Sequence, residues 1–114
     1  RQWVMLFQGA PAPLTLHVRV SADHLETSPG RAGIRCRLAW VSPSFTHYET
    51  AFFDFPAGTY AWRDLEFPLR SSHPLRAVQV QPELRSGVHG DLRIARISVQ
   101  DAAGREYAVD PDFK

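Results

Sequence analysis

The sequence predicts an all-β domain, a jelly-roll β-sandwich of two antiparallel sheets with about eight strands. Apolar and polar residues alternate in several segments between residues 14 and 99. Residues typical of turns separate these segments about every ten residues. No long amphipathic helix interrupts the series, so a sandwich is favoured over a fold that alternates helices with strands.

Residues 14–21 and 34–41 alternate most strictly, and they predict strands that are buried on one face. The loop expected at residues 23–33 is polar and contains Ser-Pro-Gly, and a short helical turn at 22–26 is an alternative for its start. The expected strands are residues 3–7, 14–21, 34–41, 48–55, 62–69, 77–84, 92–99 and 105–109.

Two irregularities are expected within these strands. The apolar positions change parity between Ile94 and Ile97, which predicts a β-bulge at residues 95–96. Pro82 has no backbone N–H to donate, so its strand should be bulged there or lie at the edge of a sheet.

Composition places the chain among ordinary globular domains. Its 114 residues suit a single domain, residues 1–114, and 44% of them are hydrophobic. Apolar runs are far shorter than the roughly 20 residues of a membrane-spanning helix. Cys36 is the single cysteine, so no internal disulfide is possible. Because the sequence begins with Arg1 and shows no signal peptide, we expect a domain cut from a longer protein.

The charge pattern bears on possible partners. The formal net charge is +1, and the 13 basic residues are 12 arginines and one lysine. A nearly neutral chain with almost no lysine argues against a nucleic-acid partner. An anionic polysaccharide remains open, because Arg35 and Arg37 fall on the same face of their strand.

The order of the segments resembles that of the galactose-binding-like jelly-roll domains, and most closely the carbohydrate-binding modules attached to xylanases and glucanases. The segments that carry the resemblance are a strand ending in Val-Arg-Val at 18–20, Ile-Arg-Cys-Arg-Leu-Ala-Trp at 34–40, Gly-Thr-Tyr-Ala-Trp at 58–62, Leu-x-Phe-x-Leu at 65–69, Val-x-Val at 78–80 and Gly-Asp-Leu-Arg-Ile-Ala-Arg-Ile-Ser-Val at 90–99. It implies that the strands near Ile34, Tyr48 and Ala77 share one sheet, and that a face of this sheet binds glycans.

Parity then assigns the side chains on that face. Apolar residues at alternate positions of each strand point into the core, which leaves the intervening residues on the surface. Aromatic rings can stack on the CH faces of sugar rings, and polar groups can bind their hydroxyls. The candidate ligand-binding residues are therefore Arg35, Arg37, Tyr48, Phe52, Asp54, Gln79, Gln81 and Glu83.

We expect no catalytic residues, no metal ligands and no cofactor. Modules of the resembling family often hold a structural calcium through acidic residues in the last strand, where this chain has Ala95 and Arg96. Asp91 is the nearest carboxylate there, and calcium requires several oxygen ligands. The five histidines show no metal-binding spacing.

One pair of acids is a candidate for catalysis. Asp64 and Glu66 share a strand face, roughly 7 Å apart, which is within the range of a glycosidase pair. Acids on one strand are more typical of a solvated surface, so we expect no enzyme. Among the tryptophans, Trp40 is expected in the core and Trp62 at the edge of the sandwich, and Trp3 is left open between core and sugar stacking.

The sequence thus favours a non-catalytic carbohydrate-binding module that is an accessory domain of an extracellular or bacterial-envelope protein, with a polysaccharide or oligosaccharide as its ligand. The alternative is a structural module that docks onto a neighbouring catalytic or membrane domain of the parent chain and binds no sugar.

Overall fold

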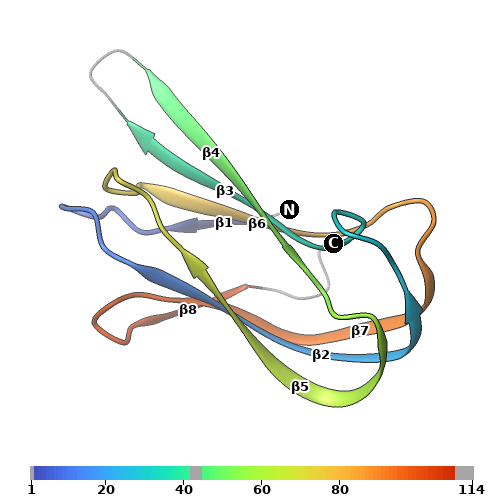
Figure 1. Ribbon diagram of the computed structural model, residues 1–114. Coiled ribbons are helices and arrows are strands. Elements are labelled where there is room, and N and C mark those ends of the chain that lie inside the picture. The colour runs from blue at the N-terminus through green and yellow to red at the C-terminus, as the bar shows by residue number, and fades with distance from the viewer. Residues whose placement is uncertain (1, 42–44, 110–114) are drawn as a thin grey trace.

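The computed structural model describes residues 2–41 and 45–109, and Figure 1 shows two sheets packed face to face. Both are antiparallel and four-stranded, with the orders β1-β6-β3-β4 (sheet A) and β5-β2-β7-β8 (sheet B). The described residues contain no helix, which confirms the all-β sandwich. The strands are β1 (Gln2–Met5), β2 (Leu14–Glu26), β3 (Ala32–Val41), β4 (Thr46–Asp54), β5 (Gly58–Leu69), β6 (Ala77–Leu84), β7 (His89–Gln100) and β8 (Glu106–Val109).

The core lies between the two sheets and is built by alternate residues of their strands. In β2 and β3 buried positions alternate with partly exposed ones, as expected where one face meets the core and the other meets water. On the edge of the sandwich, Phe53 of β4 stacks on Phe67 of β5 with ring centroids 4.9 Å apart. The core side chains that are almost fully buried include Leu16, Val18, Val20, Ile34, Cys36, Leu38, Val78, Val80, Ile97 and Val99.

The strand pairing is largely non-local. β2 pairs with β7 in sheet B, and β3 pairs with β6 in sheet A. In the sequence, β3 and β6 therefore both lie between β2 and β7. Hairpin pairs join β3 to β4 and β7 to β8. Figure 1 shows the β3–β4 hairpin rising away from sheet B at one end, while the sheets converge where β2 passes into β3.

The structure corrects the expected loop at residues 23–33. β2 continues to Glu26, and the alternative of a helical turn at 22–26 is also wrong. Leu25 is 2% exposed and so anchors this extension in the core. The polar residues next to Leu25 also belong to the strand, and Asp23 pairs with Asp91 of β7. The β2–β7 pairing includes register shifts, which the apolar periodicity of a single strand does not reveal.

The expected β-bulge is present, whereas the prediction for Pro82 is wrong for the strand as a whole. Arg19 and Val20 of β2 face Arg96 and Ile94 of β7, so Ala95 is the extra residue of a β-bulge. Pro82 lies in β6, which is an inner strand of sheet A, and the pairing of β6 with β3 has no register shift at Pro82. The pairing of β6 with β1, however, ends at Val80. Within the described residues, β6 therefore has a free edge on that side at Pro82, where the missing N–H leaves no bond unmade.

No segment of the described chain forms a helix of the length and hydropathy needed to cross a membrane.

We expect Cys36 to resist thiol reagents in the folded protein. Its side chain is fully buried, and burial raises the pKa of its thiol to about 12, so the reactive thiolate is scarce. Labelling with Ellman's reagent at pH 8 should be at least about a thousandfold slower in native buffer than in denaturant. Fast labelling of the native protein would contradict the packing of β3.

Candidate functional site

The outer face of sheet A brings together all eight predicted binding residues. Arg37 of β3 faces Gln79 of β6 on one side and Thr50 of β4 on the other. In the next outward row, Arg35 lies between Gln81 and Phe52. A further row places Gly33 between Glu83 and Asp54, and Tyr48 lies opposite Ala39. The parity assigned from the sequence therefore holds across the sheet.

The central feature of this face is an aromatic pair, Trp3 and Tyr48. Trp3 lies on edge strand β1 and Tyr48 on the opposite edge strand β4, yet their ring centroids are 6.2 Å apart and tilted by 50°. The two side chains thus reach toward each other over the strands between them. Trp3 is 42% and Tyr48 49% exposed, so nearly half of each side chain remains open to solvent.

Arg37 completes the aromatic pair. Its guanidinium carbon lies 4.3 Å from the centroid of the Tyr48 ring, which is a cation–π contact. One face of Tyr48 is therefore occupied by the protein itself. Trp3, whose ring is contacted by no described guanidinium, keeps exposed ring surface for a ligand.

Phe52 packs differently from Tyr48. Gly33 lies beside it, and a Cβ added to Gly33 would come within 2.8 Å of Cε1 and 2.9 Å of Cζ of the Phe52 ring. The ring therefore lies low over Gly33, and it is half-buried. The guanidinium carbon of Arg85 is 5.9 Å from its centroid.

Glu83 joins two arginines on this face. Its Oε1 lies 3.0 Å from Nη2 of Arg35, and its Oε2 lies 3.1 Å from Nη2 of Arg85. The carboxylate is only 13% exposed, so the two guanidiniums screen it from water. Glu83 thus fixes the position of Arg35 and has little capacity left for a ligand.

The other predicted residues have unequal access. The backbone N–H of Gly30 donates a 2.7 Å hydrogen bond to Asp54 Oδ1, so Asp54 holds the turn before β3. Gln79 is 4% exposed, which leaves its amide little contact with a surface ligand. Gln81 is half-buried beside Arg35. Access thus favours Arg35, Arg37, Tyr48 and Gln81.

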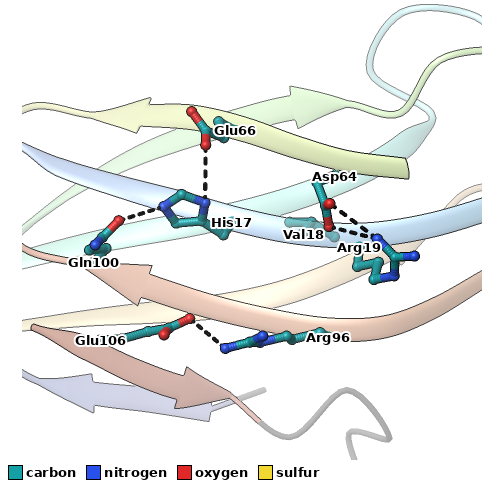
Figure 2. A pocket seen from close by; sticks show the side chains of 8 residues that line it. All are labelled: His17, Val18, Arg19, Asp64, Glu66, Arg96, Gln100 and Glu106. Carbon is teal, nitrogen blue, oxygen red and sulfur yellow. Dashed lines mark hydrogen bonds and ion pairs between the residues drawn. The ribbon is translucent and has the colours of Figure 1, made fainter. Parts of the chain in front are cut away.

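The outer face of sheet B carries a shallow depression of about 410 Å³ whose charges are paired (Figure 2). Arg19 Nη1 lies 3.1 Å from Asp64 Oδ2, and His17 Nδ1 lies 3.5 Å from Glu66 Oε1. Asp64 and Glu66, the candidate catalytic pair, therefore each have a basic partner on the neighbouring strand β2. Arg96 forms a third pair with Glu106, at 2.9 Å.

Glu106 is the acid of this face whose pKa is shifted. A 2.6 Å hydrogen bond donated by the Ser98 hydroxyl is the largest cause that lowers the pKa of Glu106, and Arg96 lowers it further. A lowered pKa favours the ionised form that accepts these bonds. The pattern is that of a cross-strand ion-pair network that stabilises the sheet.

Trp40 is not enclosed by the core as expected. It has core-side parity, but it lies on the β3–β4 hairpin that rises away from sheet B, and it is half-buried. Its ring stacks on His73 at 4.4 Å and on His47 at 5.2 Å.

Trp62 is 43% exposed on edge strand β5, in line with the expected edge position. No group of described residues has an arrangement that could hold a metal ion.

The sequence did not single out Trp3 or Arg85 as site residues. The strand that contains Trp3 is short and has no clear alternation, so the sequence does not decide whether Trp3 lies in the core or on the surface. The place of Trp3 beside Gln79 follows only from the β1–β6 register. Arg85 follows the end of β6, and its role depends on the long-range position of Phe52. The aromatic character of Trp3 is the one feature of the sequence that indicates a binding role for this residue.

A search of protein-family models, curated proteins and solved structures finds no match for this chain.

Gly33→Ala should destabilise the fold, because the added methyl would collide with the Phe53 carbonyl oxygen and the Phe52 ring. We expect a loss of about 1–3 kcal/mol in the free energy of unfolding, measured by urea denaturation. Gly9→Ala is the matched control, since no atom lies within 4 Å of its added Cβ. Equal stability of the two variants would contradict the packing of Phe52.

Ser98→Ala should raise the pKa of Glu106, since it removes the larger of the interactions that favour the carboxylate. Carboxylate titration by NMR measures this, and Arg96→Gln should also raise the pKa of Glu106, because Arg96 lowers it through both its charge and its hydrogen bond. Because the folded-state pKa is lowered, the stabilisation from Glu106 is present above its unfolded pKa and is lost as the pH falls through its folded pKa. An unchanged pKa in Ser98→Ala would show that the hydrogen bond does not form.

Proposed function

We propose that this domain is a non-catalytic carbohydrate-binding module that binds a polysaccharide on the outer face of sheet A. The observation that carries the proposal is the exposed aromatic pair of Trp3 and Tyr48, which spans the sheet with Arg37 against it. Exposed aromatic rings fixed on strands are suited to stack on the CH faces of pyranose rings.

Polar groups flank the aromatic pair at distances set by the strands. Arg35 and Gln81 lie side by side in one cross-strand row, and Arg37 lies in the adjacent outward row. Because neighbouring strands are about 4.8 Å apart, these polar groups lie close enough together to hydrogen-bond several hydroxyls of one bound glycan. Their placement on strands rather than loops keeps them ordered before a ligand arrives.

The proposal extends to the class and setting of the domain. A binding face without a deep cavity suits a polymer that passes across it, as in the galactose-binding-like modules that the sequence resembles. The structural polysaccharides of cell walls and extracellular matrices lie outside cells or in the bacterial envelope, and we propose the same setting for the parent protein. A single site of this kind binds weakly. Its binding would still hold a neighbouring catalytic domain of the parent chain close to the polysaccharide, and so raise the effective concentration of that polysaccharide at the catalytic domain.

A second candidate function rests on an apolar row on the same face. Met5, Ala77, Ala39 and Tyr48 face one another across the four strands of sheet A. The two end residues, Met5 at 46% and Tyr48 at 49%, are exposed, whereas Ala77 and Ala39 between them are buried. Such a row next to an aromatic pair also suits a neighbouring domain of the parent chain that docks onto sheet A without any sugar.

Trp3→Ala should reduce polysaccharide retention at least about tenfold, because it removes the ring of the aromatic pair that no described arginine covers. The measurement is pull-down of the isolated domain on a panel of insoluble polysaccharides and glycan arrays, with calcium and with a chelator. Trp62→Ala is the matched control, since Trp62 is similarly exposed, at 43%, but lies on sheet B. It should retain wild-type binding.

Thermal unfolding separates loss of binding from loss of fold. Trp3→Ala should melt within a few degrees of the wild type. If the folded wild-type domain is retained on no polysaccharide, the glycan proposal fails and docking by the apolar row becomes the better account. Equal loss in Trp62→Ala would place the binding surface elsewhere.

A further inference from the structure

The arginines on the outer face of sheet A differ in what neutralises them. Arg35 and Arg85 share the Glu83 carboxylate, at 3.0 and 3.1 Å. Arg37 forms no ion pair with any acid of the described chain, and its cross-strand neighbours, Gln79 and Thr50, are uncharged. The centre of the binding face therefore carries a positive charge that the described residues do not neutralise.

The contact of Arg37 with Tyr48 leaves its hydrogen-bonding capacity free. The guanidinium carbon lies 4.3 Å from the ring centroid, so the ring contacts the group without accepting from its N–H bonds. A guanidinium is planar and carries five N–H donors in that plane, which match the two oxygens of a carboxylate. The ring also restrains the side chain, so less rotamer freedom is lost when a ligand binds.

The adjoining Trp3 adds a surface for the sugar ring itself. The centroids of Trp3 and Tyr48 are 6.2 Å apart, and Arg37 contacts the Tyr48 side of this pair. A pyranose stacked on Trp3 thus has a fixed, unneutralised guanidinium next to it. Since a pyranose is about 5 Å across, a substituent on its rim is within reach of that guanidinium.

We propose that the ligand of this face is an acidic polysaccharide, and that Arg37 binds the carboxylate of a uronic acid residue whose ring stacks on Trp3. This inference rests on the proposed glycan-binding function and names its substrate class. Arg37 is then the residue that selects acidic over neutral polymers, because a neutral sugar leaves its charge without a counterpart.

Pectic polygalacturonate in two forms provides the test, since methyl esterification removes the carboxylate charge and keeps the sugar backbone. Affinity electrophoresis should show the wild-type domain binding the de-esterified polymer at least about tenfold more tightly than the highly esterified one. Alginate, as a second uronate polymer, should also be bound. Rising salt should weaken binding to the acidic form more than to the esterified form.

Two substitutions assign the effect to Arg37. Arg37→Gln should abolish the preference for the acidic polymer and keep the weaker binding to the esterified one. Arg93→Gln is the matched control, because Arg93 is an exposed β7 arginine on sheet B for which no described acid is an ion-pair partner. It removes the same charge from the domain and should keep the preference. Melting temperatures within a few degrees of the wild type confirm that both variants fold.

The outcomes separate this inference from the proposed function. Equal binding of both polymer forms by the wild type overturns the acidic ligand and leaves glycan binding intact. Binding to no polysaccharide overturns both. A preference that both Arg37→Gln and Arg93→Gln reduce equally would show general charge attraction and overturn the role of Arg37.

Discussion

Burial of alternate β3 side chains is the constraint on which the rest of the structure depends. Ile34, Cys36 and Leu38 are at most 3% exposed between the two sheets. Because the pleat has a period of two residues, burying these three forces Arg35 and Arg37 onto the outer face. A slip of one residue would move both charges into the core, so the hydrophobic core and the polar surface specify the same register.

The candidate site adds a long-range requirement to this local one. The pairing of β1 with β6 places Trp3 beside Gln79, while the β3–β4 hairpin brings Tyr48 from the opposite edge. Neither ring belongs to a central strand, and each is held by one pairing partner. The aromatic pair therefore forms only when both edge strands are docked, so the candidate surface depends on a complete sheet A.

Sequence periodicity predicted the parts of this arrangement that are local. The alternation of β2 and β3, the parity of β4 and β6 and the bulge at Ala95 follow from the spacing of apolar residues within one strand. The extension of β2 to Glu26, the pairing of Glu83 with Arg85 and the position of Trp3 could not be predicted in this way. The extension of β2 and the position of Trp3 depend on register between strands far apart in sequence, and single-strand periodicity contains no information about partners. Arg85 is close to Glu83 in the sequence, but it lies beyond the end of β6, where strand periodicity does not place its side chain.

The two outer faces explain why sheet A rather than sheet B is the candidate. Both carry arginines and acids, but on sheet B the acids pair with bases of adjacent strands, as Asp64 does with Arg19 and Glu106 with Arg96. Such cross-strand pairs satisfy one another and leave no net requirement for a ligand. On sheet A, Glu83 neutralises the arginines at one end, while Tyr48 replaces an acid as the neighbour of Arg37. An aromatic ring positions a cation without cancelling its charge. Arg93 of sheet B also has no ion-pair partner among the described residues, but it has no cation–π contact there, so the combination of Arg37 with the Trp3–Tyr48 pair is what favours sheet A as the candidate.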